Sequence, residues 1–157
     1  AFGCLDENGE IQEEQTKEII DIIKKYHGEV VFHRAFDCVK DPYESMEKLI
    51  AMGVDRVLTS GLKAKAMGGM ELIAKLQELY GEKIEILAGS GINASNALEI
   101  MEKTGISQVH SSCKGWVEDP TTTGKEVSYS YAQGIHINDY DMVDEKLVRE
   151  ILERIEI

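Results

Sequence analysis

The chain has 157 residues, of which 43% are hydrophobic, and a formal net charge of −12. This size and composition predict one domain, residues 1–157, that is able to bury a core. The negative charge repels nucleic acid and anionic lipid, and no apolar run is long enough to cross a bilayer, so we expect neither nucleic acid nor a membrane as partner. Three cysteines without CxxC spacing fit reduced thiols, and the first residues do not resemble a signal peptide, so we expect a cytoplasmic location.

One pattern recurs along the chain: an apolar run, a polar or glycine-rich stretch, and a helical segment that ends at a glycine. The expected strands are 1–5, 29–37, 54–61, 83–92 and 106–112. The expected helices are 12–26, 42–52, 70–80, 93–104 and 144–155, with Asp41 and Asn93 as N-terminal caps. The Gly- and Thr-rich segment 115–134 receives neither assignment.

Strands separated by about 25 to 30 residues, with a helix between them, predict an α/β fold with a parallel sheet. Such a sheet is either open and doubly wound or part of a (β/α)8 barrel of about 250 residues. The alternation of side chains along the expected strands favours the barrel. Val57 faces the helices while Arg56 and Leu58 face inward, and such a polar inner layer does not suit an open sheet that is covered by helices on both faces. Five strands are too few to close a barrel, so we expect an incomplete one whose N-terminal units are missing.

Two glycine-containing stretches follow expected strands and are candidates for binding an anion. In "LAGSGI", residues 87–92, the glycines permit close backbone approach before a helix N-terminus, although they also suit a plain tight turn. In "LTSGL", residues 58–62, two hydroxyls and a glycine end the preceding strand, and a solvated turn explains them as well. The predicted anion-binding residues are Thr59, Ser60, Gly61, Gly89, Ser90, Gly91, Ser111 and Ser112.

The stretch "FHRAFD", residues 32–37, carries an imidazole, a guanidinium and a carboxylate at the end of an apolar run. His33 aimed inward could act as an acid, a base or a ligand, with Asp37 setting its tautomer or pairing with Arg34. The alternative is an Arg34–Asp37 ion pair that ties down a loop, with His33 as a hydrogen-bonded interior residue. With His110, these three residues are the catalytic candidates.

His110 and Cys113 flank two serines at the end of the last expected strand. A thiolate and an imidazole suit copper(I) or zinc, although no zinc-finger spacing supports a metal site and buried apolar thiols are the competing explanation. The sequence lacks a nucleophile elbow, a Walker lysine and a GxGxxG motif.

The motifs "FHRAFD", "RVLTSG", "LAGSGI" and "VHSSC", in this order and spacing, resemble the CutC family, named for copper homeostasis. The resemblance extends from "AFGCLDENGEI" to the terminal helix. It implies a cytoplasmic (β/α)8 barrel that self-associates as a homo-oligomer, with suspected copper binding and no agreed enzymatic reaction. By the same resemblance, the four motifs end strands five to eight of the family's barrel.

The family's first three units, whose strands carry further cysteines and acidic residues, have no counterpart here. Three functions therefore remain open at this point. The first is copper binding and handling of the CutC type, and the second is a barrel enzyme that binds a small phosphorylated substrate at the C-terminal rim of the strands. The third is a non-catalytic assembly module that pairs through exposed sheet edges.

Overall fold

The computed structural model describes residues 1–155 and divides the chain into two compact units. Unit 1 comprises Ala1–Ile92 and Asn96–Ser111, and unit 2 comprises Asn93–Ser95 and the chain from Ser112 onward. None of the helices within residues 1–155 has the length and apolar character that a membrane span requires.

Unit 1 contains a four-stranded parallel sheet in the order β1-β2-β3-β4. The strands are β1 (Val31–Phe32), β2 (Arg56–Thr59), β3 (Glu85–Gly89) and β4 (Gln108–His110). Register is continuous across the sheet, since Leu58 pairs with Leu87, which pairs in turn with Gln108. The predicted parallel α/β architecture is therefore confirmed, and the carboxyl ends of the strands lie at one edge.

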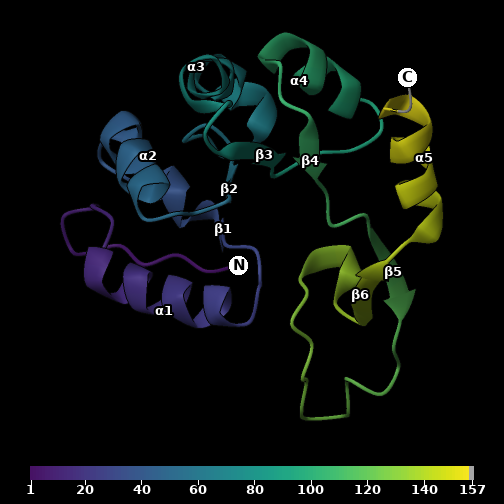
Figure 1. Ribbon diagram of the computed structural model, residues 1–157. Helices are drawn as coiled ribbons and strands as arrows, with labels where there is room; N and C mark the ends of the chain where they lie inside the picture. The colour runs from purple at the N-terminus through teal and green to yellow at the C-terminus, as the bar shows by residue number, and fades with distance from the viewer. Residues whose placement is uncertain (156–157) are drawn as a thin grey trace. The chain divides into compact units, whose positions relative to one another are not determined.

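The α-helices of unit 1 lie in an arc beside the sheet, as Figure 1 shows. They are α1 (Glu13–Lys25), α2 (Pro42–Ala51), α3 (Met70–Tyr80) and α4 (Ala97–Thr104). The sheet and the helices share one apolar core, because side chains from both are almost wholly buried. Its fully buried members include Val30, Phe32, Val57, Ala88, Met46, Leu49, Ile73, Leu76 and Ile100.

Of the two predicted N-terminal caps, Asp41 is confirmed and Asn93 is wrong. Asp41 caps α2 as expected, because its Oδ1 accepts hydrogen bonds from the amides of Tyr43 and Glu44 at 2.9 and 3.1 Å. Asn93 does not cap α4: the helix starts after Asn96, and Asn93 Oδ1 accepts from the amide of Ser95 in a local turn. Side-chain bonding to the nearby backbone is the ordinary alternative to capping for asparagine.

All five expected strands are shorter than predicted, and the first two are reduced most. Segment 1–5 contributes only isolated bridges, of which Phe2 to Phe32 is parallel and extends the pattern of the sheet by a single residue pair. Strand β1 ends at Phe32, because His33 then caps a 3-10 helix, η1 (Arg34–Cys38). The "FHRAFD" motif is therefore a helical turn that follows a strand, and His33 and Arg34 do not alternate along a strand.

Alternation on β2 agrees with the sequence prediction. Val57 and Thr59 are fully buried, whereas Arg56 and Leu58 on the opposite face are only partly buried. At the amino end of this second face, Arg56 Nε donates to Glu85 Oε2 at 2.5 Å, and Gln108 Nε2 donates to the same oxygen at 2.6 Å. The hydrogen bond from Arg56, followed by that from Gln108, lowers the pKa of Glu85 below its ordinary value. The expected polar inner layer is present.

Unit 2 contains an antiparallel hairpin that the sequence analysis did not predict. Strand β5 (Lys114–Glu118) pairs with β6 (Asp139–Val143), and the connection between them includes a 3-10 turn, η3 (Gly134–His136). The Trp116 ring stacks on His136 at 4.2 Å between centroids. Helix α5 (Glu145–Ile155) follows the hairpin and matches the expected last helix within one residue at its start.

Candidate functional site

Asp37 is the centre of a polar cluster at the carboxyl edge of the unit 1 sheet. Its Oδ1 accepts hydrogen bonds from Thr59 Oγ1 at 2.6 Å, from the Ser60 amide at 2.9 Å and from the Leu62 amide at 3.2 Å. Its Oδ2 accepts from Ser60 Oγ at 2.9 Å and from Arg34 Nε at 2.7 Å. One carboxylate thus joins the turn after β1 to the loop after β2.

The Asp37 carboxylate is held in its charged form. Only 7% of its side-chain surface is exposed, and this burial alone would raise its pKa. The hydrogen bonds from Thr59, Ser60 and Arg34 outweigh burial and lower the pKa of Asp37 below its ordinary 3.8. A fixed anion therefore anchors this edge at neutral pH.

The loop after β2 can reach Asp37 because two glycines let its backbone fold tightly. Gly61 has φ +68°, and a Cβ there would lie 2.3 Å from the carbonyl oxygen of Gly69. The single proton of the Ser60 hydroxyl is shared between Asp37 Oδ2 and the Lys63 carbonyl, and the Gly61 amide donates to Thr59 Oγ1 at 2.9 Å. The hydroxyls of Thr59 and Ser60, predicted to bind an anion, are thus engaged in holding the loop.

Arg34 is positioned by the cluster but remains accessible. Its Nε is bound to Asp37, its Nη2 donates to Ser60 Oγ at 2.8 Å, and 41% of its side-chain surface is exposed. Within residues 1–155, Nη1 has no protein partner. The ion pair is the contact expected if Arg34 and Asp37 tie down a loop, and it fixes one edge of a guanidinium whose side chain is still partly exposed.

His33 contacts the backbone instead of Asp37. Its Nδ1 accepts a hydrogen bond from the Ala35 amide at 3.1 Å, so the neutral ring carries its proton on Nε2. Gly3 packs closely on the ring, because a Cβ at Gly3 would lie 2.5 Å from Nδ1. Asp37 therefore does not set the tautomer of His33, and a role for His33 as an acid or base stays a prediction.

The loop after β3 is tied to the loop after β2. Ser90 Oγ donates to the Ala64 carbonyl at 2.8 Å, and the Ala66 amide donates to the Ser90 carbonyl at 3.1 Å. Ser90 and Gly91 both have positive φ, +82° and +75°. Of the other predicted anion-binding residues, Ser111 Oγ donates to the Ile92 carbonyl at 2.8 Å, so it too has a structural contact.

Gly89 ends β3, where it pairs with His110 on β4. A Cβ at Gly89 would lie 2.6 Å from Leu58 Cδ1, so a larger residue would force that side chain to move. His110 itself is exposed at the end of β4. The structure therefore brings the ends of β2, β3 and β4, with their polar residues, to the edge where Arg34 lies.

The candidate metal ligands fall in different units. His110 ends β4 in unit 1, whereas Ser112 and Cys113 begin the second stretch of unit 2, with Cys113 at φ +43°. Among residues 1–155, no group of three or more His, Cys, Asp or Glu side chains is arranged to hold a metal. An imidazole and a thiol remain suitable donors for copper(I), and metal binding stays a prediction.

Two lysines that no sequence motif singled out lie close to this edge. Lys63 and Lys65 lie in the loop after β2, both are exposed, and the Lys65 stem lies near Gly91, where a Cβ would be 2.7 Å from Lys65 Cδ. With Arg34 they place three cations on the connections that follow β1 and β2, in a chain of net charge −12. Both lysines stand in the stretch "GLKAKAM", which directly follows an expected strand end.

Comparisons with known proteins agree with these motifs. The family model described as the CutC family matches residues 1–115. The CutC family protein of Bacteroides fragilis is 35% identical over 156 residues, which is 98% of this chain and 61% of that protein. The CutC family protein of Glaesserella parasuis is 42% identical over 115 residues, which is 73% of this chain and 46% of that protein.

A solved structure from Streptococcus agalactiae, named as a proposed copper homeostasis protein CutC, matches with a TM-score of 0.63 at 30% identity. The match covers 69% of this chain and 52% of that one. This chain thus spans between about half and three fifths of the length of these relatives, and its parallel α/β sheet corresponds to part of a TIM-type barrel. The chain belongs to the CutC family.

Proposed function

We propose that this protein acts in cytoplasmic copper homeostasis as a copper-binding member of the CutC family. The observation that carries the proposal is the family match over residues 1–115, together with the copper homeostasis name of the solved relative. Copper(I) is the cargo, and the imidazole of His110 and the thiol of Cys113 are its two candidate ligands, because donors of these kinds suit this ion. Self-association as a homo-oligomer belongs to the same proposal.

An anaerobic copper(I) titration against a chromophoric chelator tests the copper proposal. We expect one copper per chain, with affinity lowered at least about tenfold by both His110→Ala and Cys113→Ser. Cys38→Ser is the matched control, because Cys38 is an exposed thiol at the end of η1. Equal loss in all three variants, or no stoichiometric uptake by the unmodified chain, would contradict the proposal. Sedimentation over a range of concentrations tests the homo-oligomer.

A separate observation favours a second function, the binding of a small anionic ligand, such as a phosphorylated compound, at the carboxyl edge of the sheet. That observation is the Arg34 guanidinium, which Asp37 and Ser60 hold by two contacts while its Nη1 edge stays exposed. Such preorganisation lowers the entropy lost when a ligand is bound. Arginine in fork geometry is the side chain best suited to phosphate and carboxylate.

Calorimetric titration with inorganic phosphate and with glucose 6-phosphate tests this second function. We expect saturable binding that Arg34→Gln weakens at least about tenfold. Arg56→Gln is the matched control, because Arg56 lies at the opposite end of the same sheet and pairs with Glu85. If both variants bind as well as the unmodified chain, or if neither anion binds to it, the anion site is wrong.

A further inference from the structure

A cavity of about 490 Å³ opens between α2 and α3, on the helix-bearing side of the unit 1 sheet. This volume falls within the range of small-molecule sites. Tyr43 from α2 lines it, together with Glu71, Leu72 and Lys75 from α3 and Lys63 from the preceding loop. Neither Arg34 nor Asp37 lines it, although Gly61 and Lys63 of the loop after β2 do, so the cavity adjoins the Arg34 site without including its guanidinium.

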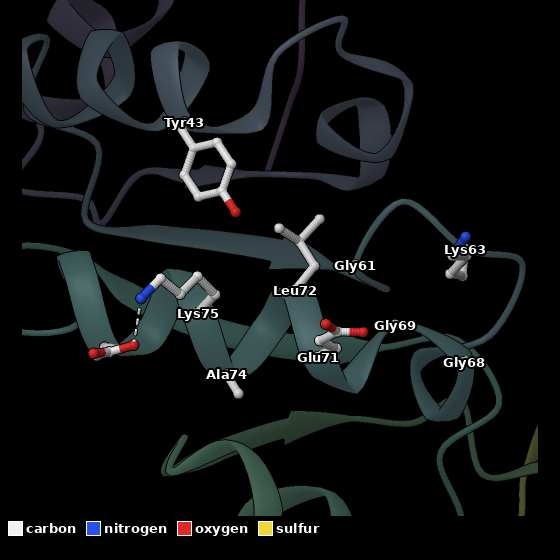
Figure 2. Close-up of a pocket in the computed structure, with 10 residues that line it drawn as sticks. Tyr43, Gly61, Lys63, Gly68, Gly69, Glu71, Leu72, Ala74 and Lys75 are labelled. Atoms are coloured by element: carbon white, nitrogen blue, oxygen red, sulfur yellow. Dashed lines mark hydrogen bonds and ion pairs between the residues drawn. The ribbon is translucent and has the colours of Figure 1, made fainter.

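One part of the cavity is apolar. Figure 2 shows the Tyr43 ring reaching from α2 toward α3, with its hydroxyl directed toward Leu72. Tyr43 is 39% exposed and Leu72 is partly buried, so both keep surface that a ligand can cover. An aromatic ring opposite an aliphatic side chain is suited to a flat or branched apolar group.

The part nearer Gly68 and Gly69 carries two opposite charges. The Lys63 stem packs along Gly68, since a Cβ at Gly68 would lie 3.7 Å from Lys63 Cβ. Glu71 lies in the first turn of α3 and points toward the same part, as Figure 2 shows. Within residues 1–155, neither side chain forms an ion pair. Lys75, by contrast, is already paired with Glu78 at 2.8 Å.

From this arrangement we propose that the cavity binds a compact zwitterion with an apolar body, the chemistry of an α-amino acid. The ligand's ammonium group pairs with Glu71 and its carboxylate pairs with Lys63. Its apolar body lies between Tyr43 and Leu72. A ligand with both charges gains from two charged partners that do not satisfy each other in its absence, so it is preferred over an amine or an acid of equal size.

Titration with three probes tests this site on the complete chain: L-phenylalanine, phenethylamine and 3-phenylpropanoate, followed by ligand-observed NMR. We expect L-phenylalanine to bind most tightly. Glu71→Gln weakens the binding of L-phenylalanine and phenethylamine at least about tenfold but leaves that of 3-phenylpropanoate unchanged. Lys63→Gln weakens the binding of L-phenylalanine and 3-phenylpropanoate by a similar factor but leaves that of phenethylamine unchanged. Tyr43→Ala weakens all three.

The matched controls are Glu82→Gln and Lys83→Gln, which neutralise the same charges on exposed residues that do not line the cavity. Both controls leave binding unchanged, and melting curves verify that every variant is folded. Absence of saturable binding by all three probes in the millimolar range overturns the proposal. Equal weakening by the controls, or no preference for the zwitterion, overturns it as well. Loss of copper or phosphate binding leaves this test unaffected, because Arg34, His110 and Cys113 lie outside the cavity lining.

Discussion

Replacing Asp37 with asparagine tests how strongly the carboxylate holds the two loops together. The change keeps the shape of the side chain but removes the charge and turns one acceptor oxygen into a donor. The amide nitrogen would face Arg34 Nε or the Ser60 amide, which are also donors. Hydrogen bonds to a charged group contribute about 1.5 to 3 kcal/mol each, and about two are lost or weakened. We therefore expect Asp37→Asn to lower the free energy of unfolding by about 3 kcal/mol.

Urea denaturation followed by far-ultraviolet circular dichroism measures this loss. Asp21→Asn is the matched control, because Asp21 is an exposed residue of α1 with no side-chain partner within residues 1–155, and it should change stability by less than about 0.5 kcal/mol. A loss of less than about 1 kcal/mol for Asp37→Asn, similar to the control, would refute the reasoning that the buried charge organises this edge.

Three further predictions follow from single contacts. Because folding lowers the pKa of Asp37, its carboxylate contributes fully to the free energy of unfolding above the unfolded pKa near 3.8, and this contribution is lost as pH falls through the folded pKa. In urea titrations, the stability difference between the unmodified chain and Asp37→Asn should therefore narrow only below about pH 4. Gly61→Ala should lower the free energy of unfolding by at least about 3 kcal/mol, because its Cβ would meet the backbone of Gly69. Gly53→Ala, which also has positive φ (+82°) but open space at its Cβ, should lower it by about 1 kcal/mol. Equal urea midpoints for the two variants would contradict the close contact with Gly69. Asp41→Ala should cost about 1 kcal/mol in the same assay through loss of the α2 cap, and no change would show that the cap is dispensable.

The alternation of apolar and polar side chains predicted the sheet, because a strand with one buried face leaves this pattern in neighbouring residues. Val57 and Thr59 alternate with Arg56 and Leu58, and the first pair is the buried one. Glycines also predicted where helices end: Gly105 follows the last residue of α4 in the left-handed conformation, with φ +74°. Such signals depend on residues close in sequence, so no tertiary information is needed to interpret them.

The Asp37 cluster could be predicted only in part. The sequence placed Asp37 beside Arg34, three residues away, and the ion pair follows from that spacing. Its contacts with Thr59 and Ser60 span more than twenty residues, and only the folded sheet brings the ends of β1 and β2 together. The shift from strand to 3-10 helix at His33 was missed, because a histidine that caps a turn has the same sequence pattern as one inside a strand.

The hairpin of unit 2 was missed for a different reason. Strands β5 and β6 carry glycine and acidic residues, which are depleted in strands, and the long connection between them obscures their pairing. Trp116 and Asp141 are direct partners across the pair, although 24 residues lie between them in the sequence. Pairing at that distance depends on tertiary contacts that no local window contains.

The most direct test of the proposed anion site follows the arginine side chains themselves. The chain has four arginines, so their Nε–H signals can be assigned one by one in a ¹H–¹⁵N spectrum during a phosphate titration. We expect a saturable shift of the Arg34 signal alone, with Arg56 at the far end of the sheet unchanged. An Arg34 signal that does not move, or proportional drift of all four signals without saturation, would contradict the claim that Asp37 aims Arg34 at a ligand.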